Sequence, residues 1–267
     1  MQFKATGFTR EEERIFRKLE RELGRLGKRQ MAEVVRTLKA SGLTGQELVD
    51  RAIDVLSPAQ FKVEIKATVQ PYIEQVVKAG GKRGDDGIED AIARFGRGEL
   101  MPSVGFDFAN PEVQKWVNSS TTRLADGVGD TTEVRVRSLL GKGLEEGKTI
   151  DELASDLEAK GFDAARARVI ARTESARGYV QGQIESWKQS GVVAGKKWLV
   201  APEACPFCEA IGATDTTKGM GDTFLNVGDS VTASDGSRYV IDFENVSGPP
   251  LHPNCRCDLI PVLEGEE

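Results

Sequence analysis

Apolar residues recur every three or four positions along most of residues 10–190, which predicts a succession of amphipathic helices. Threonine followed three residues later by glutamate is the capping-box pattern, and it marks predicted helix starts at Thr9, Thr44 and Thr149. The clearest apolar stripe follows the first of these starts and consists of Ile15, Leu19, Leu23, Leu26, Val34 and Leu38. A long first helix is therefore expected.

Prolines and glycines indicate where the other helices begin and end. Pro58 suits the first turn of a third helix, where its missing N–H costs nothing, and we expect that helix to bend or break near Pro71. A short helix is expected at residues 88–95, and residues 96–108 read as a loop and an internal boundary.

Two further starts are predicted by a proline and an aspartate. Pro111 begins a helix that should run to about Leu140, and Asp163 caps a last long helix that Gly191 ends. The apolar stripe of that last helix consists of Val169, Ala176, Val180, Ile184 and Trp187.

The pattern changes after residue 191. Residues 196–201 read as a strand, and residues 229–243 alternate around Asp235-Gly236, which predicts a hairpin. The expected fold class is α+β, with a mostly helical N-terminal body followed by a small β-rich C-terminal module. Three consecutive regions are predicted: residues 1–105 (helical), 106–191 (a helical core) and 192–267 (the β-rich module).

Composition supports a globular chain without membrane spans. Apolar residues make up 39% and charged residues 29% of the 267 positions, and no apolar run is long enough to cross a bilayer. We therefore expect no membrane partner. The first residues do not read as a signal peptide, so we expect a reducing compartment in which disulfides are disfavoured.

Charge is distributed unevenly. Residues 10–39 contain ten Lys/Arg and six Asp/Glu, a balance of +4, whereas residues 205–267 contain three and eleven, a balance of −8. The first segment could contact DNA phosphates or an acidic protein, although a mixed charged helix is also what any solvated helix looks like. The acidic C-terminal segment argues against DNA binding there.

All four cysteines and the single histidine fall in two short stretches, CPFC at 205–208 and HPNCRC at 252–257. Two ligands separated by two residues can reach one zinc ion from a tight turn, and a second such pair completes a tetrahedron. The favoured ligands are Cys205, Cys208, His252 and Cys255. A set in which Cys257 replaces His252 and four buried free cysteines are the alternatives.

A structural zinc site is favoured over a catalytic one. A catalytic zinc needs an open coordination position and a general base, and zinc would occupy the only histidine. This argues against a metal-dependent nuclease. No acidic pair on a predicted strand supports an ADP-ribosyltransferase. We therefore expect no catalytic residues and no enzymatic activity.

The stretch ARTESARGYVQGQIESWKQSGVVAGKKWLVAPEACPFCEA, together with GPPLHPNCRCDLIPVL, closely resembles the C-terminal region of tailed-phage minor head proteins of the Mu-F-like or SPP1-type head morphogenesis family. The resemblance covers about residues 170–263. It implies a virion protein at the portal vertex inside the prohead, present in the host cytoplasm during assembly. The implied partners are the portal protein and packaged DNA, in packaging or ejection. We expect the helical region at residues 1–105 to make much of the portal contact, through apolar helix stripes that a partner can bury or through its basic residues, and a deletion of this region would test that expectation. A zinc-containing nucleic-acid-binding protein is the alternative.

Three charged residues of the ARTE stretch are candidates for structural ion pairs. Arg172 and Glu174 are two positions apart on a helix and cannot pair with each other, whereas Glu174 can meet Arg177. These residues either anchor the helix to the zinc module or a partner, or form an ordinary surface ladder.

Overall fold

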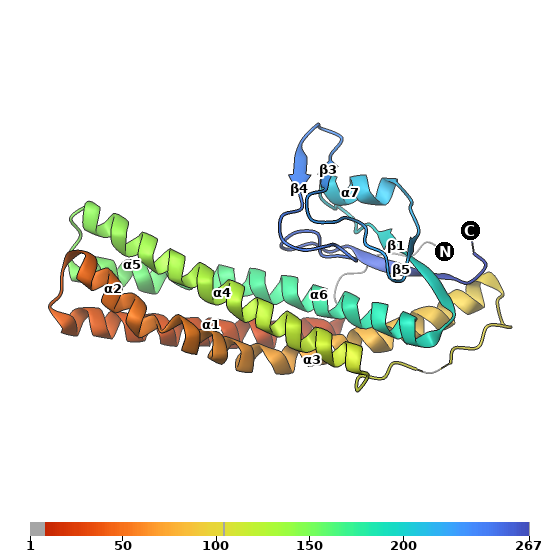
Figure 1. Cartoon of the computed structure of the whole chain (residues 1–267), viewed down its shortest axis with the longest axis horizontal. Helices are drawn as coiled ribbons and strands as arrows, with labels where there is room; N and C mark the ends of the chain where they lie inside the picture. Colours follow the sequence, from red (N-terminus) through yellow and green to blue (C-terminus); the bar gives the residue numbers. More distant parts are fainter. Residues whose placement is uncertain (1–8, 104, 267) are drawn as a thin grey trace. The chain divides into compact units, whose positions relative to one another are not determined.

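The computed structural model describes residues 9–103 and 105–266, and the chain divides into two compact units (Figure 1). The helical unit consists of residues 16–72 and 116–171, and the mixed unit consists of residues 1–15, 73–115 and 172–267. The helices are α1 (Arg10–Ser41), α2 (Gly45–Leu56), α3 (Pro58–Phe95), α4 (Pro111–Glu145), α5 (Ile150–Lys160), α6 (Ala164–Ser190) and α7 (Pro206–Ala213). Helices α1, α3, α4 and α6 contribute residues to both units.

The strands all lie in the mixed unit. They are β1 (Val193–Leu199), β2 (Lys218–Gly219), β3 (Ser230–Thr232), β4 (Arg238–Val240) and β5 (Asp258–Leu263). The α+β class is therefore confirmed. The division into three consecutive regions stays a prediction. Among the described residues, no helix has the combination of length and apolar character that membrane crossing requires.

Most of the predicted helix ends are confirmed by hydrogen bonds at the caps. At α1, the Thr9 N–H donates to Glu12 Oε2 (2.7 Å) and the Glu12 N–H donates to Thr9 Oγ1 (3.3 Å). The same reciprocal pair exists at Thr149. The capping box at Thr44 is wrong: its side chain makes no cap hydrogen bond. Gly45, directly after it, has a φ of +58°, so the chain does not enter α2 in the geometry that the box needs.

The helix was expected to bend or break near Pro71, and it does not break there: α3 is one continuous helix that also absorbs the short helix predicted at residues 88–95. Proline inside a helix removes one hydrogen bond and costs about 3 kcal/mol. On either side of it, Val69, Ile73, Val76 and Val77 are at most 1% exposed. Burial of these four side chains outweighs the loss, at about 1.5–3 kcal/mol each.

Within the mixed unit, α3 and α6 approach each other at glycines. A Cβ atom added to Gly182 would overlap the carbonyl oxygen of Val77 and lie 2.6 Å from the nitrogen of Gly81. A Cβ atom on Gly80 would overlap the carbonyl oxygen of Tyr179. The two helix backbones therefore touch, which only glycine permits at these positions.

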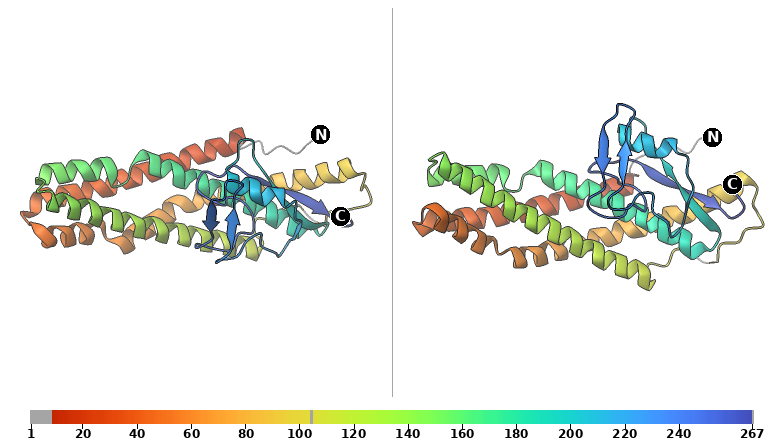
Figure 2. Two further views of the ribbon diagram at one scale, coloured as in Figure 1. Left: turned by 90° about the horizontal axis from the view of Figure 1, so that it is seen from above. Right: turned by 45° about the horizontal axis from the view of Figure 1, so that its top comes forward.

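The long strands β1 and β5 pair side by side in antiparallel register, with Lys196 opposite Pro261 (Figure 1). Strand β2 pairs on the other edge of β1, which gives the order β2-β1-β5. The strand expected at residues 196–201 is thus confirmed, with a start at Val193. The expected hairpin is confirmed as β3 and β4, with Gly236 in the turn at a φ of +84° (Figure 2). Neither α7 nor β5 was predicted.

The sheet packs on α6 through a core that includes Trp187, Val193, Leu259 and Leu263. Trp187 is 1% exposed, and its indole N–H donates to the carbonyl oxygen of Gly84 on α3 (3.2 Å). A second core holds the cysteines together with Trp198, Ile211, Val231 and Ile241. The long last helix is therefore the support on which the C-terminal strands are built.

Candidate metal centre

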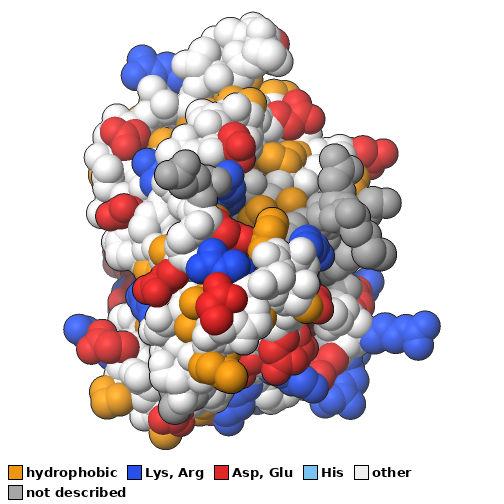
Figure 3. Space-filling view, turned by 90° about the vertical axis from the view of Figure 1, so that its right-hand side faces the viewer, with side chains coloured by type: hydrophobic (Ala, Val, Ile, Leu, Met, Phe, Trp, Pro, Cys, Tyr) orange, Lys and Arg blue, Asp and Glu red, His pale blue; other side chains and the backbone are white. Residues whose placement is uncertain are grey.

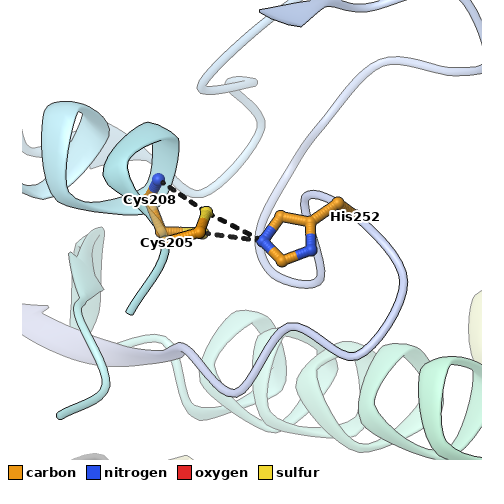
Figure 4. A group of neighbouring side chains, drawn as sticks. All are labelled: Cys205, Cys208 and His252. Atoms are coloured by element: carbon orange, nitrogen blue, oxygen red, sulfur yellow. Dashed lines mark hydrogen bonds between the residues drawn. The ribbon is translucent and has the colours of Figure 1, made fainter. Parts of the chain in front are cut away.

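The two cysteine-containing stretches lie against each other in the mixed unit. Cys205 Sγ is 3.0 Å and Cys208 Sγ is 3.6 Å from His252 Nε2, and these three side chains point toward one another (Figure 4). Cys208 Sγ is also 3.7 Å from Cys255 Sγ. The ligand atoms form two groups that share Cys208: Cys205, Cys208 and His252 in one, and Cys208, Cys255 and Cys257 in the other. The structure thus brings together all five donors singled out from the sequence.

The first stretch is positioned by the start of helix α7. Cys205 is the N-cap residue, and its Sγ accepts a hydrogen bond from the N–H of Cys208 (3.4 Å). Pro206 occupies the first turn, where its missing N–H leaves no bond unmade. The sequence suggested only a stiff turn here. Helix α7 places the positive end of its dipole beside the Cys205 sulfur.

The second stretch turns back on itself between its two candidate ligands. Asn254 adopts a φ of +63°, a conformation that asparagine tolerates better than most residues, and the Cys255 N–H donates to the His252 carbonyl oxygen (3.1 Å). The Asn254 N–H donates to Thr173 Oγ1 (3.3 Å), which ties this turn to α6. The ARTE stretch therefore contacts the second cysteine-containing stretch directly through Thr173.

The imidazole orientation suits a metal ligand. His252 Nδ1 is 2.8 Å from the carbonyl oxygen of Pro253, an acceptor only, so the proton of the neutral ring belongs on Nδ1. This leaves the Nε2 lone pair directed at the thiols of Cys205 and Cys208. Metal-binding histidines generally use their second nitrogen in this way.

The separations match those of a tetrahedral site. Zn–S bonds of about 2.3 Å and Zn–N bonds of about 2.0–2.1 Å place ligand sulfurs about 3.8 Å apart and sulfur and nitrogen about 3.6 Å apart. The Cys208–Cys255 and Cys208–His252 distances are 3.7 and 3.6 Å. The Cys205–His252 distance of 3.0 Å is shorter than this spacing. The chain can therefore hold a metal ion here with small side-chain adjustments.

The buried thiols of Cys208 and Cys255 lie within hydrogen-bond distance of each other. This contact lowers the pKa of the Cys255 thiol and raises the pKa of the Cys208 thiol. Cys255 is 6% exposed, so the thiolate that this arrangement favours lies in a poorly solvated place. A soft cation would neutralise that charge, and it would deprotonate the remaining thiols.

The predicted ion-pair residues lie on α6 beside this centre. Arg177 Nη1 is 2.6 Å from Glu174 Oε1, and Arg177 Nη2 is 3.2 Å from Glu244 Oε1 in the segment after β4. Glu174 is 7% exposed. Arg172 lines a small pocket together with Tyr179, Cys255 and other residues of the second stretch. The Arg177–Glu244 pair thus joins α6 to the C-terminal segment after β4, whereas the Glu174–Arg177 pair lies within α6.

Other polar contacts of this region have no signal in the sequence. Arg83 on α3 pairs with Asp258 Oδ2 at 2.8 Å, directly after the last cysteine. Burial raises the pKa of Asp258, and the nearby Arg83 charge opposes this shift. Glu244 likewise meets Arg177 only because the chain folds back over α6. Such partners lie too far apart in the sequence for spacing to reveal them.

Together, the fold and the site define an α+β protein whose mixed unit carries a Cys/His cluster that could hold a metal ion. Residues 134–260 match the model of the family described as Phage Mu protein F like protein. This match confirms the resemblance inferred from the sequence. The chain contains a Mu F-like region, which indicates a protein related to phage heads.

A curated relative is "Uncharacterized protein YqbB" of Bacillus subtilis (strain 168), which is 23% identical over 209 residues. The alignment covers 77% of this chain, and the chain spans about 63% of the length of that relative. No solved structure gives a significant match.

Proposed function

We propose that this chain is a non-enzymatic minor head protein of a tailed bacteriophage, associated with the portal and acting in head morphogenesis and in DNA packaging or ejection. The Mu F-like region at residues 134–260 carries this proposal. The protein would reside in the virion, inside the prohead at the portal vertex, and in the host cytoplasm during assembly.

The C-terminal module holds a structural zinc ion in this proposal. The ligands are Cys205, Cys208, His252 and Cys255, and Cys257 is the alternative to His252. The support is the convergence of the five donors and the tetrahedral spacing around Cys208. Zinc in such a site stabilises the fold of a small module by joining its ends.

Elemental analysis tests the zinc site. Protein made under reducing, zinc-replete conditions should contain about one zinc per chain, following the four-ligand rule. Cys205→Ser should release the metal, whereas Cys257→Ser is the matched control and should retain it. Zinc-free wild-type protein would refute the site. Zinc loss in Cys257→Ser with retention in a His252→Ala variant would assign the fourth position to Cys257.

The exposed side of helix α1 is not the apolar stripe that was expected to meet a partner. The apolar stripe of α1 was expected to be open to a partner, but its members are at most 3% exposed and pack within the protein. The exposed side of α1 is cationic instead. Eight cations lie on this side: Arg17, Lys18, Arg21, Arg25, Lys28, Arg29, Arg36 and Lys39.

The eight cations lie on one face of α1, with a gap between Arg29 and Arg36. At about 100° per residue the eight side chains fall within a sector of about 120°, which contains no Asp or Glu, and they extend over about 33 Å. Three of them pair with flanking acids: Arg17 with Glu20, Arg25 with Glu22, and Lys39 with Asp151. Arg17, Arg21, Arg25 and Lys28 also line a groove of about 430 Å³ between α1 and the start of α6.

By contrast, acidic and basic side chains are intermixed on the face of the molecule seen in Figure 3. The cationic face of α1 is therefore our proposed contact with an acidic portal surface. Deleting residues 1–105 would not test this cleanly, because Gly84 and Arg83 of α3 bind Trp187 and Asp258 in the mixed unit.

Charge reversal is the sharper experiment. The double variant Arg21→Glu and Lys28→Glu should lower co-purification with a portal ring and incorporation into proheads. The matched control reverses two exposed cations elsewhere in the helical unit, Arg51→Glu and Lys142→Glu, with the same change in net charge. Equal incorporation of both variants would show that the cationic face does not dock on the portal.

DNA is a second candidate partner for the cationic face of α1, because a row of cations along a helix suits a phosphate backbone. Each phosphate contact contributes about −0.9 to the slope of log K against log salt. Loss of Arg21 and Lys28 contacts should therefore reduce the slope by about 2, measured by filter binding to duplex DNA of random sequence. An unchanged slope would exclude this face from DNA contact.

A further inference from the structure

The hairpin of β3 and β4 has a free edge on β3. Ala233 N–H donates to the Ser237 carbonyl oxygen (2.9 Å), and Ile241 N–H donates to the Asp229 carbonyl oxygen (2.9 Å). Hydrogen-bonded and non-hydrogen-bonded pairs alternate along an antiparallel ladder, so the backbone groups of Ser230 and Thr232 point away from β4.

These edge groups have no visible partner. Over residues 9–103 and 105–266, no hydrogen bond to the backbone N–H or C=O of Ser230 or Thr232 comes from outside the hairpin. A free strand edge is a template for another extended chain. The structure therefore presents two amide and two carbonyl groups in strand geometry.

The free edge borders a groove of about 330 Å³ whose opposite wall is α7. All three residues of β3 line this groove, although successive side chains of a strand point to opposite faces, so β3 faces the groove with its edge. Figures 1 and 2 show α7 beside the hairpin. This volume falls within the range of about 300–1,000 Å³ that is typical of ligand sites.

The residues that line the groove indicate the chemistry of the ligand it could bind. Apolar side chains come from Ile211, Phe224, Leu225 and Val231, and hydroxyl groups come from threonines and Ser230. Lys218 is the one charged residue among those that line it. The groove thus offers a place for one apolar side chain, with a cation at its margin that suits a carboxylate.

We propose that the groove between β3 and α7 binds an extended segment of a partner polypeptide, which adds to β3 as a strand. An apolar side chain of that segment lies on the groove floor, and an acidic residue of the segment meets Lys218. This mode of recognition takes its affinity from main-chain hydrogen bonds and its selectivity from the alternate side chains. The inference does not depend on the proposed head function.

The test uses the full chain labelled with ¹⁵N and four synthetic heptapeptides. Each peptide has blocked ends, alternating valine and serine, a terminal glutamate, and valine, isoleucine, leucine or phenylalanine at its centre. At least one should shift the amide signals of Ser230 and Thr232. N-methylation of alternate peptide amides keeps the side chains but removes the hydrogen bonds, and it should weaken binding at least about tenfold.

Two directly paired residues supply matched protein variants. Thr232→Pro removes an edge N–H that faces the groove, and Arg238→Pro does the same on the opposite edge of the hairpin. Only Thr232→Pro should weaken binding, and Lys218→Glu should weaken it for these acidic peptides. The spectra away from the hairpin report whether each variant is folded.

Three results would overturn the inference. The first is no shift with any of the four peptides at millimolar concentration. The second is equal binding of the N-methylated peptides, which would exclude strand addition. The third is a shift of the Ser230 and Thr232 signals with protein concentration in the absence of peptide, which would identify a second copy of this chain as the occupant.

Discussion

The contact between α3 and α6 offers a strict test of how this fold is held together. The change is Gly182→Ala, which adds one methyl group on α6 at the point where the backbone of α3 is nearest. That methyl carbon would overlap the carbonyl oxygen of Val77 and lie 2.6 Å from the nitrogen of Gly81. Both neighbours are backbone atoms of a helix, so neither can rotate away as a side chain would.

Two opposing effects determine the size of the change. Alanine is favoured over glycine in a helix by about 1 kcal/mol. Overpacking that forces backbone shifts costs typically about 1–3 kcal/mol and sometimes more. Because the obstacle at Gly182 is backbone on two sides, we place the cost at or above the upper end. We therefore expect a net loss of about 2 kcal/mol or more in the free energy of unfolding.

Gly87→Ala on α3 is the matched control, because a Cβ atom there would meet no atom within 4 Å. It should gain up to about 1 kcal/mol from helix propensity alone. Urea unfolding followed by circular dichroism measures both variants, with equal slopes showing that the unfolded states are comparable. A Gly182→Ala protein as stable as Gly87→Ala would refute the close contact.

Further predictions concern single side chains. Thr149→Ala should lower the free energy of unfolding by about 1 kcal/mol through loss of its cap, and Thr44→Ala, which loses no cap bond, should cost clearly less in the same urea assay. Glu174→Ala should cost about 1–3 kcal/mol because its carboxylate is buried and paired, and a change within about 0.5 kcal/mol would mean a surface role. Burial lowers the pKa of Lys196 to about 8 from 10.5, so the unfolded chain binds more protons between these values and stability should rise with pH across them. Lys196→Met should abolish that rise and add about 1–3 kcal/mol at pH 7, as measured by denaturation across that pH range.

Local chemistry explains what the sequence could predict of the fold. Pro111, Thr149, Asp163 and Gly191 each act through their own backbone or a bond three residues away, and the helices begin or end where they stand. Pro71 acts locally too, but its effect is outweighed by side chains packed from elsewhere in the chain. Sequence spacing contains no measure of that packing.

Among the strands, too, some are predicted by local sequence signals and one depends on pairing with a distant segment. The Asp235-Gly236 turn and the alternation around it sufficed for β3 and β4. Strand β5 was missed because its identity depends on pairing with β1, about 60 residues earlier, and its Pro261 reads as a loop signal. Lys196 in β1 is only 1% exposed, and nothing in the surrounding sequence predicts that this lysine is buried.

For the candidate metal centre, clustering in the sequence singled out the five cysteine and histidine side chains that the structure brings together, whereas their role as ligands stays a prediction. The sequence could not show that Cys208 belongs to both groups of donors, nor that the Pro253 carbonyl oxygen orients the imidazole. These features arise from the packing of the second stretch against α7 and α6. The choice between His252 and Cys257 stays a prediction for the metal analysis.

The contact between Cys208 and Cys255 joins positions 47 residues apart, so the chain between them forms a loop whose two ends are held together. Each doubling of such a loop costs only about 0.6 kcal/mol in closure entropy. Insertions at the exposed turn between β3 and β4 should therefore leave the cluster intact, whereas replacement of His252 or of the buried Ile241 should disturb it. The cysteine contact thus closes a loop whose exposed hairpin turn can vary in length at little entropic cost, while the buried side chains of the loop stay in the core around the donors.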